Sequence, residues 1–555
     1  MNVNDTDIIR SLLQQAGWRE SLEANDADLL LTNTCAIREG AEQKVWQRLR
    51  ELRGQNRKLA KRRRKVIGVL GCMAERLQEG LLKDGLADLV VGPDAYRDLP
   101  RLARQVLQRH EYVNRKKQQQ SPQQDDNIDV EVDVDASHAV NVQLSLDETY
   151  ADITPVRADP DDVSAFVSIQ RGCDNRCSFC IVPFTRGQER SRPLDSILDE
   201  IRQLHLEHNV KEVTLLGQNV NSYHDVSEAA LIANPTSRYQ LSNKGFRSRI
   251  RRPDGGYYFA DLVERVSDLS PELRVRFTSP HPKDYPTALL DLMAERPNVC
   301  NHLHMPAQSG SSSLLKRMKR GYTREAYLAL VFDNILPRIP DISLSTDMIA
   351  GFCGETDEEH ADSVSLLETV RYDQAFLFAF SMREKTHAHR TLQDDVPEEV
   401  KQQRLRQLID TYQAAVHAKN AAEEVGKLRL VLLEGPSKRS TPEQPAWHGR
   451  TDQNKRIVFP VDDNLSCFDD DGGLDPVTLL TTMAMDTEQQ RFRHGTLQKG
   501  DYAVVEVTEA KGHTLRGKLL YRTTLQRFAE HEARLKEHND RDFRGSKSVV
   551  QSATA

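Results

Sequence analysis

The sequence predicts an α/β protein of three folded units: an N-terminal α/β unit, a central partial (βα)6 barrel and a small C-terminal β-barrel. Three observations support this. Over residues 156–400, short β-branched runs alternate with amphipathic helical segments, the pattern of a parallel sheet. Residues 1–110 show a shorter alternation of the same kind, whereas residues 425–525 hold strand-like runs separated by turns. A chain of 555 residues has room for about three or four domains.

The N-terminal unit begins with helical periodicity over residues 5–16. An apolar run at Asp28–Leu31 leads to Cys35, and the strand-like Val66–Leu70 ends at Gly71 and Cys72. Because no strand-like run precedes the first helix, we expect the unit to lack a first strand. Residues 111–155 turn rich in Gln and Asp with few large apolar side chains, which predicts a disordered linker.

The central unit should contain six strands, each followed by a helix. The predicted strands are Ala165–Gln170, Glu212–Leu216, Arg274–Thr278, His302–Met305, Ser343–Ile349 and Phe376–Phe380. In such folds the functional loops follow the carboxyl ends of the strands. The polar residues 225–256 interrupt one connection and are predicted to be a surface insertion.

A connecting helix is predicted over residues 401–424, and the C-terminal barrel over residues 425–525. Its predicted strands are Leu428–Leu433, Arg456–Phe459, Tyr502–Thr508 and Thr514–Leu520. Residues 526–555 are predicted to be a disordered tail.

Composition excludes several classes of protein. No apolar run approaches the roughly 20 residues of a membrane span, so no membrane association is expected. Eight cysteines in so long a chain, without a secretory signal, indicate a reducing compartment and no disulfide framework. No targeting segment is recognisable at the N-terminus. The net charge of −7 means that nucleic-acid binding would depend on local basic patches.

Three cysteines lie within eight residues, at Cys173, Cys177 and Cys180. An electron-carrying cubane or a structural zinc site uses four ligands, so three thiolates leave one iron of a cubane open to a small chelating molecule. Two alternatives are three buried structural cysteines and a zinc site completed by a distant His. The C-x3-C-x2-C motif resembles the signature of the radical S-adenosylmethionine superfamily, in which that open iron binds S-adenosylmethionine.

A closer resemblance, to the MiaB branch of the tRNA methylthiotransferase family, rests on longer segments. They are Cys180–Gly187, Glu189–Pro193, Leu216–Val220, Phe277–Pro282, Pro306–Ser311 and Asp347–Phe352. The resemblance implies methylthiolation at C2 of N6-isopentenyladenosine beside the anticodon. It also implies tRNA as substrate, an electron donor of the flavodoxin or ferredoxin type, a monomer, and a mitochondrial or cytoplasmic location.

The resemblance also implies site residues. Cys173, Cys177 and Cys180 would hold the 4Fe–4S cluster that acts in catalysis. Phe179 would lie against the adenine of S-adenosylmethionine, although simple packing explains it equally well. Other polar side chains that follow strands could bind the same cofactor: Gln218, Gln308, Ser309 and Asp347.

Cys35 and Cys72 each end a predicted strand and could converge on one site. In the family, three N-terminal cysteines hold an auxiliary 4Fe–4S cluster linked to sulfur donation. The first of those ligands precedes a Met-Asn-Val-Asn-Asp-Thr run, and this sequence starts at that Met. Two explanations stay open: an N-terminally incomplete chain, or loss of sulfur transfer. Cys300, Cys353 and Cys467 are interpreted as small apolar residues.

The C-terminal barrel resembles a TRAM domain, an RNA-binding module. The resemblance implies phosphate contacts from basic residues: Lys438, Arg439, Arg450, Lys455, Arg456 and Arg516. Two other functions stay open: a sister methylthiotransferase with another substrate, and a non-catalytic adaptor that regulates a cyclin-dependent kinase, which only the resemblance suggests. An adaptor has no need of three cluster ligands.

Overall fold

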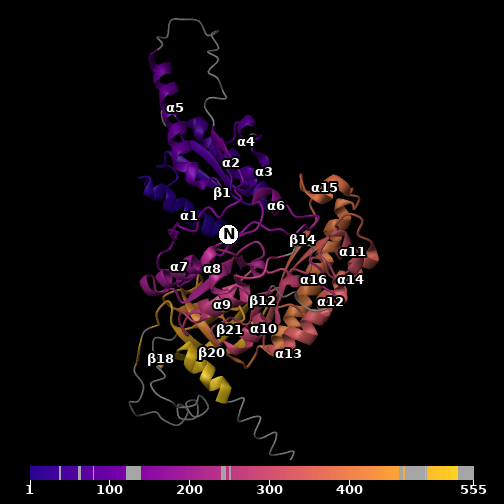
Figure 1. Cartoon of the computed structure of the whole chain (residues 1–555). Coiled ribbons are helices and arrows are strands. Elements are labelled where there is room, and N and C mark those ends of the chain that lie inside the picture. The colour runs from indigo at the N-terminus through magenta and orange to yellow at the C-terminus, as the bar shows by residue number, and fades with distance from the viewer. Residues whose placement is uncertain are drawn as a thin grey trace, which may run out of the picture.

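The computed structural model describes residues 1–36, 39–59, 64–78, 80–119, 139–238, 245–248, 252–461, 467–468, 494–495 and 497–534. Figure 1 shows the N-terminal unit in indigo and the C-terminal barrel in yellow at opposite ends of the central unit. The N-terminus lies at the junction of the first two units. No helix of the described residues is long and apolar enough to cross a membrane.

The N-terminal unit is a parallel sheet in the order β1-β2-β3-β4, covered by helices on both faces. Side chains of β2 alternate between the faces: Val66 and Leu70 pack with α1 and α5, whereas Ile67 and Val69 pack with α2, α3 and α4. This two-sided burial explains why the strand is apolar throughout. The elements are α1 Asn2–Gln15, β1 Leu29–Thr34, α2 Glu39–Lys58, β2 Val66–Gly71, α3 Cys72–Leu77, α4 Gly80–Lys83, β3 Leu89–Val91, α5 Leu99–Gln119 and β4 Ala139–Asn141.

The prediction of a disordered linker over residues 111–155 is wrong at both of its ends. Helix α5 extends to Gln119, and β4 pairs with β3 as the edge strand of the sheet. Beyond β4, the Tyr150 hydroxyl donates to the Pro93 carbonyl and accepts from the Tyr96 amide. A few apolar side chains after the acidic run, such as Tyr150 and Ile153, therefore pack against the N-terminal unit. Residues 120–138 lie outside the described residues.

The central unit is the predicted partial barrel. Its six strands form two parallel three-stranded sheets, β5-β8-β11 and β12-β13-β14, and a bridge between Val275 and Val299 links them. The six are β5 Ser164–Ser168, β8 Glu212–Leu216, β11 Arg274–Phe277, β12 His302–His304, β13 Ser343–Ala350 and β14 Gln374–Ala379. Each agrees with its predicted strand to within two residues.

Helices and short strand pairs surround this barrel. The helices are α6 Val182–Thr185, α7 Leu194–Glu207, α8 Glu228–Ala233, α9 Phe259–Ser267, α10 Thr287–Glu295, α11 Ser312–Arg317, α12 Arg324–Ala329, α13 Leu336–Arg338, α14 Asp357–Val370, α15 His387–Thr391 and α16 Glu398–Glu423. The short strands are β6 Gln170–Arg171, β7 Arg190–Ser191, β9 His224–Asp225 and β10 Tyr257–Tyr258.

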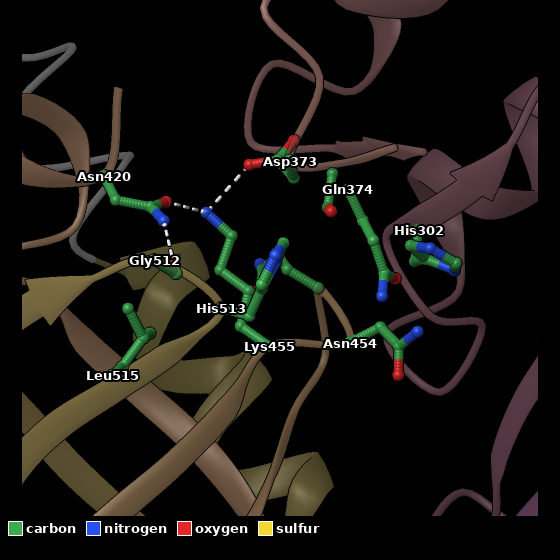
Figure 2. Close-up of a pocket in the computed structure, with 11 residues that line it drawn as sticks. His302, Asp373, Gln374, Asn420, Asn454, Lys455, Gly512, His513 and Leu515 are labelled. Atoms are coloured by element: carbon green, nitrogen blue, oxygen red, sulfur yellow. Dashed lines mark hydrogen bonds and ion pairs between the residues drawn. The ribbon is translucent and has the colours of Figure 1, made fainter. Parts of the chain in front are cut away.

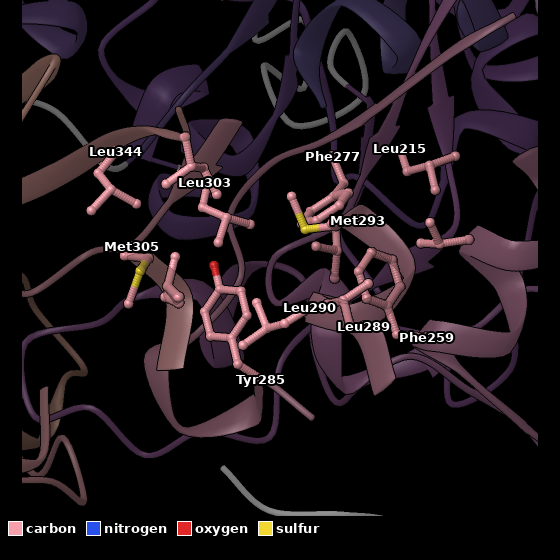
Figure 3. Packing of buried hydrophobic residues seen from close by; sticks show 14 of the residues in the cluster. Leu215, Phe259, Phe277, Tyr285, Leu289, Leu290, Met293, Leu303, Met305 and Leu344 are labelled. Carbon is pink, nitrogen blue, oxygen red and sulfur yellow. The ribbon is translucent and has the colours of Figure 1, made fainter. Parts of the chain in front are cut away.

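An apolar core lies between the strands of the central unit and the helices around them. Figure 3 shows Leu215 and Phe277 of the strands packed with Phe259 of α9 and Leu289 of α10. The rings of Phe259 and Phe277 meet edge to face at 5.1 Å, a favoured geometry for aromatic pairs. The Tyr285 hydroxyl donates to the His304 carbonyl at 3.3 Å, so its burial leaves no unpaired donor.

The predicted insertion, residues 225–256, is more than a surface loop. Phe246 is buried against the Tyr322 ring, and Arg252 forms an ion pair of 2.8 Å with Glu189. Both contacts bring the insertion toward the loop that holds Cys173–Cys180. Residues 239–244 and 249–251 lie outside the described residues.

The C-terminal unit is a closed barrel in the order β15-β16-β17-β21-β20. Its strands are β15 Leu428–Pro436, β16 Ala446–Thr451, β17 Arg456–Pro460, β20 Tyr502–Lys511 and β21 Thr514–Thr523, beside a short pair, β18 Cys467–Phe468 and β19 His494–Gly495. Strand β16 was not predicted, because Gly449 and polar neighbours interrupt its apolar alternation. Residues 525–534 are helical with Leu525 buried, so the tail prediction is wrong there.

The barrel packs against the amino ends of the central strands, opposite the cysteine loops. Arg274 at the start of β11 donates to the carbonyls of Leu430 and Arg450, and Arg276 to those of Thr451 and Asp452. These bonds place the barrel at the end of the central unit away from the N-terminal unit.

Lys455 strengthens the same attachment (Figure 2). Its ammonium group lies 2.8 Å from Asp373 and 2.9 Å from both Asn420 and Glu424. Asn420 in turn donates to the Gly512 carbonyl. Lys455 is therefore engaged within the protein, and its phosphate contact stays a prediction.

Candidate active site at the cysteine loops

The C-x3-C-x2-C loop directly follows β6 and is fixed at both ends. Gly172 opens it with φ +74°, and a Cβ there would lie 1.9 Å from the Gln188 carbonyl oxygen, so only glycine fits. Farther along, the Ser178 amide donates to the Met318 carbonyl, and its own carbonyl accepts from the Ala388 amide. The loop is thus held between the end of α11 and the start of α15.

The three thiols of this loop lie close enough to influence one another. Burial raises the pKa of Cys173 well above its usual value, with Cys180 adding to the effect. Burial and then Cys177 raise the pKa of Cys180 to about 12. The Arg320 guanidinium donates to Cys177 Sγ at 3.2 Å and offsets negative charge at the loop.

This donor set fits an iron–sulfur cluster with one open iron. It offers three thiols on one loop, with the Arg320 guanidinium beside them. Bound iron would deprotonate the thiols despite their raised pKa. Among the described residues, no three His, Cys, Asp or Glu side chains stand in metal-binding geometry. We therefore expect the cysteine side chains to rotate together when a cluster assembles.

A cavity of about 540 Å³ lies at the Cys180 end of the loop. Phe179, Gln308 and Asp347, three of the predicted cofactor residues, line it, together with apolar residues of β13 and β14 such as Ile349 and Leu377. Phe179 also packs edge to face on Phe352, with ring centroids 6.5 Å apart. Its ring is therefore both part of the core and a wall of the cavity.

Gln308 and Asp347 are held by backbone pairing between neighbouring strands. The backbone N–H of Gln308 donates to the backbone carbonyl of Asp347. Gln308 adopts φ +70°, an uncommon conformation for a residue other than glycine. His304 Nε2 lies 3.4 Å from the Asp347 carboxylate, and His304 Nδ1 is 2.9 Å from Ser345 Oγ. No pattern in the sequence predicts His304 beside this carboxylate.

Two predicted cofactor residues are placed elsewhere. Ser309 is 1% exposed, and its hydroxyl bonds to Ser363 and to the Ser311 amide, so it serves packing at the start of α11. Gln218 follows β8 and does not line the cavity, although its side-chain oxygen is buried without a partner among the described residues.

Cys35 and Cys72 are brought together, as their positions after two strands predict. Strands β1 and β2 pair in parallel with Thr34 opposite Gly71, so the next residue of each chain segment lies at the same edge of the sheet. Burial raises the pKa of the Cys72 thiol, and Cys35 lies near enough to raise it further. Two thiols are fewer than the three that the family resemblance implies.

Arg186, which sequence reasoning missed, connects the two cysteine sites. Its guanidinium donates to Cys72 Sγ at 3.2 Å and to Asp5 at 2.6 Å, and Arg171 lies 2.9 Å from the same carboxylate. Burial alone would raise the pKa of Asp5, but the two guanidinium groups lower it to about 2. The closest sequence signal was the Thr-Arg-Gly run after the third cysteine.

The two sites also abut through apolar packing. Ile181, directly after Cys180, packs with Ala36 and Cys72 of the N-terminal unit. On the far side of the cavity, Glu42 of α2 pairs with Arg383 at 3.2 Å. The N-terminal unit therefore lies over the carboxyl ends of the central strands, beside the cavity.

Comparisons with known proteins give the same assignment. Residues 167–367 match the radical SAM superfamily, and residues 1–92 match a family described as uncharacterized protein family UPF0004. The mitochondrial tRNA methylthiotransferase CDK5RAP1 of Rattus norvegicus is 48% identical over 528 residues, covering 95% of this chain and 80% of the relative. Its Homo sapiens counterpart is 45% identical over 546 residues, covering 95% and 81%.

A bacterial relative extends the similarity. The tRNA-2-methylthio-N(6)-dimethylallyladenosine synthase of Chloroherpeton thalassium is 45% identical over 464 residues, covering 83% of this chain and 88% of the relative. The resemblance drawn from the cysteine motif is confirmed. The chain belongs to the radical S-adenosylmethionine family of tRNA methylthiotransferases.

Proposed function

We propose that this protein adds a methylthio group to C2 of N6-isopentenyladenosine beside the anticodon of tRNA. The observation that carries the proposal is the meeting of two cysteine sites across Ile181 beside one cavity. Relatives named for this product, 45% and 42% identical to the chain, support the choice of nucleoside.

Cys173, Cys177 and Cys180 would hold a 4Fe–4S cluster. S-adenosylmethionine bound to that cluster supplies a radical able to take hydrogen from an adenine carbon, which no side-chain acid or base could do. The Phe179 ring would lie against the adenine of S-adenosylmethionine. The side-chain amide of Gln308 and the carboxylate of Asp347 would bind the ribose or the methionine part of S-adenosylmethionine.

Other walls of the cavity would help to keep water from the site. Ile349 and Leu377 present apolar surface, and the pairing of Glu42 with Arg383 ties the N-terminal unit to the end of β14. Excluding water protects a reactive species from side reactions and strengthens each polar contact within the cavity. The target adenosine would leave its stack in the single-stranded anticodon loop to enter.

Cys35 and Cys72 would contribute to a second 4Fe–4S cluster, the source of the transferred sulfur. Their adjacency at one sheet edge and the contact of Cys72 with Arg186 support this role. With the third ligand that the resemblance implies, two clusters would share the site.

Further parts of the proposal concern partners and location. tRNA is the substrate that the family acts on, and we propose an electron donor of the flavodoxin or ferredoxin type. We also propose that the protein works as a monomer in mitochondria, where the names of the CDK5RAP1 relatives place those proteins.

Anaerobic reconstitution followed by two measurements tests the function. Iron and sulfide counts should give about eight irons per chain for two clusters, about four for one, and none for an adaptor. Mass spectrometry of nucleosides from reacted tRNA should show the methylthio product. Cleavage of S-adenosylmethionine by a protein with both clusters, without any thiolated nucleoside, would overturn the choice of substrate.

A further inference from the structure

A second cavity, of about 1280 Å³, opens at the other end of the cysteine loop. Cys173–Arg176 form one wall of this second cavity. The first cavity, where S-adenosylmethionine is proposed to bind and which we call the cofactor cavity, begins at Phe179. The other walls come from α11, from the residues that follow it, and from the insertion. Six cations line this cavity: Arg176, Arg247, Lys283, Lys316, Lys319 and Arg320.

Three of these positive charges, those of Arg176, Arg247 and Lys316, are little neutralised. Asp174 is the one acidic residue among those that line the cavity, and its carboxylate already accepts from the Glu189 amide at 3.0 Å. Within the described part of the chain, no ion pair involves Arg176, Arg247 or Lys316, and all three side chains are exposed. The mouth of the cavity therefore presents a concentrated positive field, as a site for a negatively charged partner would.

The cavity reaches the cluster-binding loop itself. Cys173 lines it, and Arg320 on its floor donates to Cys177 Sγ at 3.2 Å. Lys283, also on the floor, is buried and lies 2.5 Å from Asp284. A partner seated at the mouth would approach the thiols without entering the cofactor cavity.

RNA is a poorer fit to this cavity than an acidic protein. Single-stranded RNA is bound by aromatic side chains on which bases stack, in addition to cations. Tyr322 is the one aromatic residue that lines the cavity, and it is 5% exposed. Its ring packs on Phe246 and its hydroxyl bonds to the Pro306 and Ala307 carbonyls, so it offers no face to a base.

We propose that this basic cavity is the docking site of a small acidic electron-carrier protein. The carrier loses one electron there, and the iron–sulfur cluster on Cys173, Cys177 and Cys180 gains it. This inference rests on the proposed function, which needs one electron for each cleavage of S-adenosylmethionine. Electron-transfer encounters use small interfaces guided by charge, which suits an open cavity ringed by cations.

The test uses the full chain with its cluster reconstituted and a double charge reversal at the mouth, Arg247→Glu with Lys316→Glu. The control, Arg202→Glu with Arg296→Glu, makes the same change in net charge far from the cavity lining. Arg202 of α7 is exposed and Arg296 after α10 is partly exposed, and each pairs with one carboxylate, Asp199 or Asp268. Cleavage of S-adenosylmethionine is measured with two reductants: reduced flavodoxin, which must dock, and dithionite, a small molecule that need not. Binding of oxidised flavodoxin and of tRNA is measured separately.

We expect the mouth variant to lose about tenfold in flavodoxin-supported rate at low salt, within the range of electrostatic steering. Its flavodoxin affinity should fall, while its dithionite-supported rate, its tRNA affinity and every property of the control stay unchanged. Unaltered flavodoxin binding, or a loss confined to tRNA affinity, would overturn the inference. If the unmodified protein fails to cleave S-adenosylmethionine with dithionite, the proposed function fails, and flavodoxin binding still tests the docking site.

Discussion

Arg186 and Asp5 form a buried ion pair of 2.6 Å that joins the central unit to the N-terminal unit. The carboxylate is fully enclosed, and the same guanidinium also reaches Cys72. Since burial of a lone charge is strongly unfavourable, Asp5 depends on its guanidinium partners to remain ionised, and Asp5 offsets the cost of burying the Arg186 charge. This pair therefore holds the two cysteine sites in register as well as holding the units together.

Replacing Arg186 by Gln should weaken this junction by about 3 kcal/mol, because Asp5 would keep only Arg171 as a partner. Urea unfolding measures the change in the free energy of unfolding, and amide hydrogen exchange in α1 and β1 measures the change in local opening. The double variant Asp5→Asn with Arg186→Gln should lose less than the sum of the two single losses, since it leaves neither charge unpaired. Strict additivity would show that the pair is not coupled.

Cys177→Ala should abolish reductive cleavage of S-adenosylmethionine, because two thiolates on the loop cannot hold a cubane with one open iron. The fold should persist, since backbone bonds of Ser178 hold the loop independently of the thiol. Deoxyadenosine release in an anaerobic assay and circular dichroism are the two measurements. Cys353→Ala, which removes a thiol outside the loop, should cleave normally, and deoxyadenosine from the Cys177 variant would refute the ligand assignment.

The repeating part of the fold could be predicted from the sequence. Short runs with buried apolar residues, such as Val213 and Leu215 of β8 or Leu344 and Met348 of β13, indicate strands. Their position before amphipathic helices predicts a parallel sheet. Strand β4 and the helix over residues 525–534 could not be predicted, because only a few apolar side chains in polar surroundings fix them, through contacts with distant segments. Strand β16 could not be predicted for a related reason. Its pairing with β15 and β17 in the closed barrel, and not its own residue pattern, makes it a strand.

The site was predictable where chemistry sets the spacing and not where packing does. The three loop cysteines are close in sequence because one centre must bind all of them. His304 and Arg320, by contrast, come from separate βα units and reach Asp347 and Cys177 only through the barrel's curvature. Ser309 is a different case, because it is a polar residue after a strand whose hydroxyl bonds to Ser363 within the protein. Its cofactor role stays a prediction.

Glu75 should make stability depend on pH between about 4.5 and 8. Burial, with Asp94 adding to it, raises the pKa of this carboxyl to about 8, although Lys385 and Gln78 act in the opposite direction. The folded protein binds the proton more tightly than the unfolded chain, so this contribution is complete below the unfolded pKa and is lost as pH rises through 8. Glu75→Gln should flatten the fall in melting temperature across that window, and an unchanged slope would contradict the shift.

Lys455→Met should loosen the C-terminal barrel by about 2 kcal/mol. The substitution keeps much of the side-chain volume but leaves Glu424 with Arg429 and Asp373 with Lys419 as their remaining cations. Limited proteolysis between α16 and β15 should speed up, whereas S-adenosylmethionine cleavage should continue, since no cluster cysteine lies in the barrel. Protection equal to that of the unmodified protein would show that Arg274 and Arg276 suffice for docking.

Lys438 and Arg439 in the loop between β15 and β16 remain exposed, unlike Lys455, so they are the better candidates for phosphate contacts. The double variant Lys438→Glu with Arg439→Glu should weaken tRNA binding and reduce the slope of log affinity against log salt by about 2, one for each lost contact. Point variants test these phosphate contacts more cleanly than truncation at Lys427. Removing the barrel would also remove the carbonyls to which Arg274 and Arg276 of the central unit donate. Fluorescence anisotropy at several salt concentrations gives both numbers. An unchanged salt slope, with S-adenosylmethionine cleavage intact, would mean that tRNA is held by another surface.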